Sequence, residues 1–95
     1  MLNPSLLILA SLADGEKHGY AMMQDIRSFA GVDLGAGTLY GAISRLEQQG
    51  FIEALRTKDR RQPYRLTANG RKFLAAQIAE LEPVVRTTAR RLSTA

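Results

Sequence analysis

The sequence predicts a mainly α-helical fold with a small β-hairpin, an α+β arrangement within one domain. Apolar residues recur at spacings of three and four over most of the chain, which is typical of amphipathic helices. This period changes after Gly50, where two short segments around a polar turn predict two strands. A chain of 95 residues buries only a modest core, so a partner subunit would help to stabilise it.

The first helix is predicted at residues 4–13, where Asn3-Pro4 supplies an N-cap followed by proline at the first helical position. It is apolar nearly all round, so we expect it to lie between other elements. Its segment LLILASLA is short for a signal peptide or a membrane span, and no Lys or Arg precedes it. We therefore expect a cytoplasmic protein that does not enter a membrane.

The second helix is predicted at residues 19–30, ending at Gly31. Met22, Ile26 and Phe29 follow one another at spacings of four and three, so they are expected on its buried face. A row that includes methionine could also form an adaptable ligand site, but core packing is the stronger interpretation.

The third helix is predicted to start between Ala36 and Leu39 and to end at Gly50. Its inner face is formed by apolar residues, namely Leu39, Ala42, Ile43 and Leu46. The opposite face is small and polar, with Gly37, Gly41, Ser44 and Gln48 flanked by Thr38, Tyr40 and Arg45. It lacks the Glu/Lys pairs that usually coat a helix facing solvent.

Glycines at the start of a helix could instead cradle a nucleotide phosphate. A dinucleotide-binding motif requires G-x-G-x-x-G after a buried strand, but the third glycine here comes one residue late and a helix precedes it. A P-loop would need Gly-Lys-Ser/Thr, which is absent. The glycines therefore favour a helix kept slim for close contact with another molecule.

The two strands are predicted at residues 51–57 and 63–67, joined by the turn KDRRQ. Pro63 near a strand start predicts an edge position in the sheet. Thr67 can cap the last helix, in which apolar residues repeat at spacings of four and three, as in a coiled-coil seam. This seam contains Leu74, Ile78, Leu81, Val85, Thr88 and Leu92, and Pro83 is expected to kink or split the helix.

Charge is distributed unevenly along the chain, which has a net charge of +4. Residues 1–55 carry a net charge of −3, residues 56–65 a net +4 and residues 66–95 a net +3. Such focused basic charge is expected of a polyanion binder, although a solvated basic loop would look the same. Without cysteine and with His18 as the single histidine, no bound metal or other cofactor is expected.

Together these elements predict a winged helix-turn-helix (residues 1–67) followed by a C-terminal dimerisation helix (residues 68–95) in the same compact domain. Three motifs, HGYAMMQDI, GTLYGAISRLEQQGFIEAL and YRLTANGRKFL, resemble in sequence and order those of the PadR-type transcriptional regulators. The resemblance implies a dimeric repressor that binds a double-stranded DNA operator with dyad symmetry. Such proteins are often released or tuned by a small-molecule effector. Gly35-Ala36 replaces the Ser-Pro of many relatives, so the third helix is expected to begin with a weaker cap.

The resemblance and the charge pattern together predict the DNA-contacting residues. They are expected in three places: the start of the second helix, the outer face of the third helix and the hairpin tip. The residues are His18, Gly19, Tyr20, Ala36, Gly37, Thr38, Tyr40, Gly41, Ser44, Arg45, Gln48, Lys58, Arg60 and Arg61.

Two other classes of function remain to be weighed. A winged-helix module that binds a protein and not DNA would tend to carry aromatic or aliphatic anchors on the third helix, and the outer stripe of Gly37, Gly41, Ser44 and Gln48 has none. An enzyme would need an acid–base pair, a nucleophile with its base, or a metal set, and no catalytic set of this kind is evident. A sequence-specific DNA-binding regulator is therefore the leading hypothesis.

Overall fold

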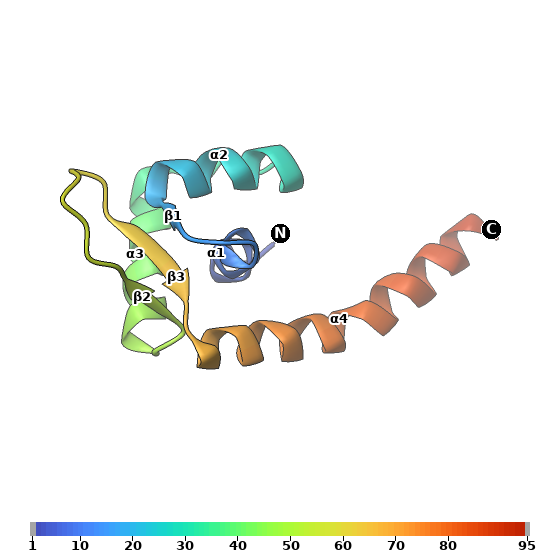
Figure 1. Ribbon diagram of the computed structural model, residues 1–95. Helices are drawn as coiled ribbons and strands as arrows, with labels where there is room; N and C mark the ends of the chain where they lie inside the picture. Colours follow the sequence, from blue (N-terminus) through green and yellow to red (C-terminus); the bar gives the residue numbers. More distant parts are fainter. Residues whose placement is uncertain (1, 95) are drawn as a thin grey trace.

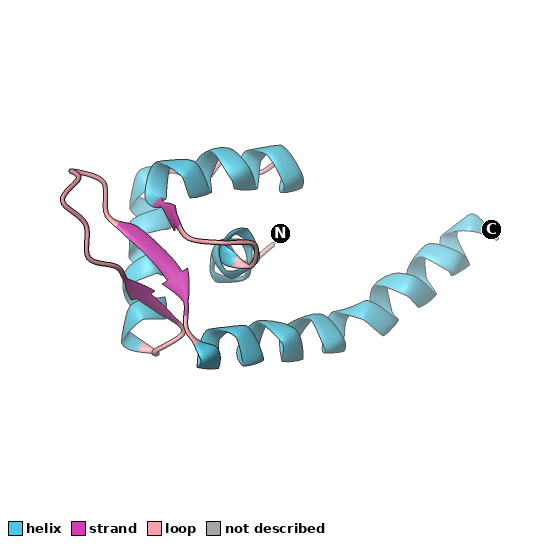
Figure 2. Ribbon diagram, viewed as in Figure 1, coloured by secondary structure: helices cyan, strands magenta, loops and turns pink. Residues whose placement is uncertain are grey.

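The computed structural model describes residues 2–94, which form four helices and a three-stranded antiparallel sheet (Figures 1 and 2). The elements follow the order α1 (Pro4–Leu12), β1 (Lys17–His18), α2 (Gly19–Ala30), α3 (Ala36–Gln48), β2 (Ile52–Ala54), β3 (Pro63–Leu66) and α4 (Ala68–Ser93). None of the helices in this part of the chain is long and apolar enough to cross a membrane.

The short helix α1 lies at the centre of the fold. Figure 1 shows it end-on between α2 and α4. Its buried residues Leu7, Ile8, Leu9 and Leu12 pack with Met22 and Ile26 of α2 and with the inner face of α3. The prediction of a helix enclosed by other elements is confirmed, because a helix that is apolar all round needs neighbours on every side.

Side-chain caps define the starts of three helices, and two of them follow the predicted residues. Asn3 Oδ1 accepts a hydrogen bond from the Ser5 N–H at 2.8 Å. Thr67 Oγ1 accepts one from the Gly70 N–H at 3.0 Å, and its own hydroxyl donates to the Gly50 carbonyl. The left-handed backbone of Gly31 ends α2, as predicted.

The sheet corrects two predictions. Strand order is β1-β3-β2, so a strand of two residues, Lys17–His18, completes a sheet that was predicted as a simple hairpin. Pro63 was predicted at an edge but begins the central strand, where it pairs with His18. A proline can occupy this position because the first residue of a strand need not donate to the ladder; its carbonyl still accepts from the Leu55 N–H at 3.0 Å.

Phe29 was predicted on the buried face of α2, but 52% of it is exposed. Met22 and Ile26 on the same face are fully buried. Phe29 lies in the last turn of α2, where no other element within residues 2–94 covers its side chain. Sequence periodicity predicts which face of a helix a residue occupies. Burial also requires another element that covers that part of the face.

Helix α4 continues through Pro83 as one helix of 26 residues, so the chain does not split there. At the normal helical rise it spans about 39 Å. Its first part packs on the body of the protein: Leu74 joins the core, and Phe73 stacks on Phe51 with ring centroids 4.3 Å apart. Figure 1 shows the rest curving away from the body.

Candidate nucleic-acid interface

Helix α3 has one buried face and one open face. Leu39, Ala42, Ile43 and Leu46 are buried, as the inner stripe predicted. Gly35 precedes the helix without a side-chain cap, which agrees with the weaker cap expected there. The helix is therefore positioned by its apolar face, which leaves the opposite face free to contact another molecule.

The open face carries the residues predicted to contact DNA. Ala36, Gly37, Thr38, Tyr40, Ser44, Arg45 and Gln48 are exposed, and Gly41 is half-buried. A Cβ added to Gly37 would meet nothing within 4 Å, and one added to Gly41 would approach only Arg45 Nη1, at 3.7 Å. No packing within the described chain therefore requires glycine at either position.

Gly19 differs from the other predicted contact residues in its burial. It is buried, and a Cβ there would lie only 2.7 Å from Tyr40 Cζ. The missing side chain thus makes room for the Tyr40 ring, which connects the start of α2 to α3. Gly19 shapes the surface by packing, whereas Tyr20 and Tyr40 beside it are about half exposed and available for contact.

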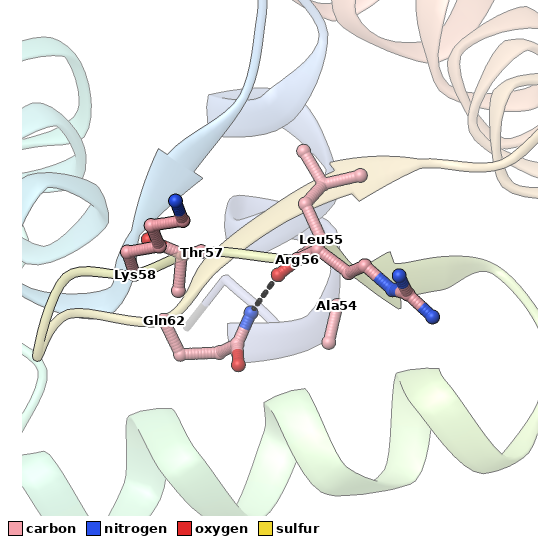
Figure 3. Close-up of a pocket in the computed structure, with 6 residues that line it drawn as sticks. All are labelled: Ala54, Leu55, Arg56, Thr57, Lys58 and Gln62. Carbon is pink, nitrogen blue, oxygen red and sulfur yellow. Dashed lines mark hydrogen bonds between the residues drawn. The ribbon is translucent and has the colours of Figure 1, made fainter.

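The wing consists of β2, β3 and the loop of residues 55–62 between them. This loop is longer than the turn predicted, because β2 ends at Ala54 and not at Thr57. Gln62 Nε2 closes it by donating to the carbonyls of Leu55, at 2.7 Å, and Pro63, at 2.9 Å. Figure 3 shows Arg56 and Lys58 extending to opposite sides of Gln62.

The basic residues of the wing tip are exposed, and two of them meet α2 and α3. One hollow is lined by residues from all three predicted segments: His18, Gly19, Tyr20, Tyr40, Arg60, Arg61 and Gln62. Lys58 lies outside this hollow and lines a neighbouring one on the wing. The structure therefore brings the HGY motif, the start of the GTLY helix and the wing tip into one continuous surface.

His18 caps α2. Its Nδ1 accepts a hydrogen bond from the Ala21 N–H at 3.3 Å. Its Nε2 lies 3.4 Å from Arg61 Nη1 in the wing. The ring thus sits where β1, α2 and the wing meet.

Strand β1, which sequence analysis missed, is held by a polar cluster around Lys17. The Lys17 ammonium donates to the Ser11 carbonyl and to Asp14 Oδ1, each at 2.5 Å. Buried Ser11 donates to Asp25 Oδ2 at 2.7 Å, so the cluster joins α1, β1 and α2. The hydrogen bond and the charge of Lys17 hold the pKa of the Asp14 carboxyl below its usual value.

Tyr64 of β3 is a second residue that the sequence did not single out. Burial, followed by the nearby charge of Glu47 and by Tyr40, raises the pKa of the Tyr64 phenol. The ring is partly buried and packs from the central strand of the wing against the core. No group of three His, Asp or Glu side chains within residues 2–94 is arranged to hold a metal ion.

The six seam residues of α4 divide into two groups. Leu74 is buried in the protein's own core, so it does not belong to a free interface. The other five, Ile78, Leu81, Val85, Thr88 and Leu92, are exposed, with Val85 at 63% and Leu92 at 73%. The seam thus packs onto the protein's own body only in the first turns of α4.

Comparisons with known proteins agree with this architecture. Residues 8–76 match the model of the transcriptional regulator PadR-like family. A 37.1 kDa protein in transposon TN4556 of Streptomyces fradiae is 45% identical over 69 residues, which cover 73% of this chain and 20% of that protein. The chain thus spans about a fifth of the length of this curated relative.

Solved structures give the same result at the level of the fold. A transcriptional regulator from Clostridium thermocellum is 29% identical, with a TM-score of 0.79 over 92% of this chain and 87% of that one. A PadR family transcription regulator from Clostridium difficile is 24% identical, with a TM-score of 0.83 over 94% of this chain and 97% of that one.

Proposed function

The chain belongs to the transcriptional regulator PadR-like family, and from this we propose that it binds double-stranded DNA as a sequence-specific regulator. The family is one of regulators and not of enzymes. Activity on DNA would place the protein in the cytoplasm.

The observation that carries the proposal is the open face of α3 beside the basic wing. A helix with glycine at two outward positions can lie close to base edges in a major groove about 12 Å wide. The wing tip, joined to it through the hollow at His18, would contact the neighbouring sugar–phosphate backbone. A protein-binding module would instead be expected to present large apolar anchors there.

A homodimer is the second part of the proposal. Five exposed seam residues on a projecting helix would bury their apolar surface against the same helix of a second copy. A two-fold dimer would present two α3 helices to DNA half-sites about 34 Å apart, which matches an operator with dyad symmetry. Repression, and release by a small-molecule effector, complete the proposal and rest on the family resemblance.

Selection of bound fragments from genomic DNA with purified protein tests the function most broadly. Enrichment of a palindromic sequence is expected. Equal recovery of all fragments would contradict sequence-specific binding, and no recovery at low salt would favour the protein-binding alternative.

The wing is expected to hold phosphates. Replacing Arg60 and Arg61 with alanine should flatten the plot of log affinity against log salt concentration by about 0.9 for each phosphate that the wing no longer holds. Affinity should fall similarly for operator and random duplexes, because backbone contacts carry no sequence information. Replacing Arg90 and Arg91, a matched pair at the far end of α4, is the control. An unchanged slope in the wing variant would mean that the wing points away from DNA.

The seam is expected to hold the dimer. Leu81→Glu combined with Val85→Glu should give monomers in sedimentation, weaken operator binding and preserve most of the helix content, because both side chains are exposed in the single chain. Wild-type protein that sediments as a monomer at micromolar concentration would contradict the dimer.

A further inference from the structure

The ring nitrogens of His18 pose a hydrogen-bonding problem. Nδ1 faces the Ala21 N–H at 3.3 Å, and Nε2 faces Arg61 Nη1 at 3.4 Å. Both neighbours are donors, and arginine has no acceptor atom. A neutral imidazole has only one acceptor nitrogen, so it can satisfy only one of them.

The backbone decides which nitrogen accepts. The Ala21 N–H direction is fixed by α2, and the first N–H groups of a helix have no partner within it. Nδ1 must therefore carry the lone pair, which leaves the proton on Nε2. Arg61 is on an exposed loop and can adjust, whereas the capped backbone cannot.

Two donors consequently face the same space. The His18 Nε2 and Arg61 Nη1 atoms are only 3.4 Å apart, and neither group can accept a hydrogen bond from the other. The hollow between them is lined also by Tyr20, Tyr40 and Arg60, and its described lining residues include no carboxylate. Glu16 and Asp59 line a neighbouring hollow that His18 and Arg61 also line. Within residues 2–94 neither carboxylate forms an ion pair with His18 or Arg61. The missing partner is an acceptor, and an anionic oxygen would satisfy both donors at once.

We propose that His18 and Arg61 hold one phosphate of the DNA backbone between them, with the His18 Nε2–H and the Arg61 guanidinium donating to the same phosphodiester group. This inference rests on the proposed DNA binding and assigns one of its contacts. His18 then has two linked tasks, since the cap bond that starts α2 also orients the donor that meets the phosphate. Gly19 and Tyr40 support the site, because the Tyr40 ring fills the space left by the glycine next to it.

The first test needs no DNA. Long-range proton–nitrogen NMR spectra of the free protein at alkaline pH should show His18 as the Nε2–H tautomer. The Nδ1–H tautomer would overturn the proposal, since Nε2 would then accept from Arg61 and the pair would need no anion.

The second test measures binding to a fluorescent random-sequence duplex. His18→Ser keeps an N-cap but is too short to reach the phosphate. At the alkaline pH of the first test it should weaken binding about five- to tenfold without changing the salt slope, because this donor then carries no charge. Arg61→Gln should lower the slope by about 0.9. In the double variant, the total decrease in affinity should be smaller than the product of the two single decreases, because both side chains contact one group.

Controls separate this inference from the function itself. Arg91→Gln removes the same charge at the end of α4 and should bind like wild type. If the wild-type protein binds no duplex, the DNA-binding proposal is wrong. If it binds and His18→Ser binds equally well, or if the two single decreases multiply, the shared phosphate contact is wrong.

The His18 resonances should respond to duplex and not to the same concentration of inorganic phosphate. An equal response to both would assign the pair to a free anion and overturn the proposal.

Discussion

Two pairs of glycines in this protein have opposite surroundings. Gly19 and Gly70 are packed against other parts of the chain: a Cβ on Gly19 would overlap the Tyr40 ring, and one on Gly70 would overlap the Phe51 carbonyl group. Gly37 and Gly41 lie on the open face of α3, where an added Cβ would overlap no other atom of the described chain.

The difference separates glycines that the protein's own packing requires from glycines whose small size has no explanation within the described chain. Glycine within a helix costs about 1 kcal/mol relative to alanine. At Gly19 and Gly70 the described chain itself explains the glycine, because a larger residue would have to displace the Tyr40 ring or the Phe51 backbone. At Gly41, in the interior of α3, nothing within residues 2–94 explains it. A neighbour outside the chain then becomes the physical explanation, and DNA is the neighbour we propose.

The largest effect is expected at Gly70. Gly70→Ala would drive a methyl group into the Phe51 backbone, which is itself held by the Thr67 N–H to Phe51 carbonyl bond at 3.0 Å. We expect the free energy of unfolding to fall by about 3 kcal/mol, at the upper end for overpacking. Chemical denaturation measures it, with Gly37→Ala as the matched control in the first turn of another helix. Equal stability of the two variants would break the distinction between the glycine pairs.

A smaller effect is expected at Gly19, because its neighbour is a half-exposed side chain that can move. Gly19→Ala should cost about 1 kcal/mol and lower the melting temperature by about 4–8 °C. The cost should disappear in a Tyr40→Ala background, where the ring is gone. A cost that persists there would show that Gly19 is required for another reason.

Sequence periodicity was sufficient for the helices of the body. The inner face of α3 followed from its apolar spacing, and the enclosed position of α1 followed from apolar residues on nearly all its sides. The strand β1 could not be found in this way, since two residues have no period and pair with β3 only after the chain has folded. Phe29 and Pro63 show the same limit: their surroundings depend on elements that are distant in sequence.

The candidate site was predictable as a set of residues but not as an arrangement. Basic charge identified the wing tip, and the small outer stripe identified α3. The meeting of His18 with Arg61, 43 residues apart, has no local pattern that could reveal it. The role of Gly19 was equally hidden, because only the position of the Tyr40 ring explains it.

The most direct measurement compares Gly41→Ala and Gly41→Glu in a melting curve and a DNA titration. Gly41→Ala should be as stable as wild type or more stable by up to about 1 kcal/mol, since the added methyl meets only Arg45 at an ordinary distance. Gly41→Glu should also fold but lose operator binding, because a bulky anion would face the groove. Ser93→Glu, which adds the same charge at the end of α4, should bind normally. Normal operator binding by Gly41→Glu would show that α3 does not read DNA, and failure of that variant to fold would show that Gly41 serves the protein's own packing.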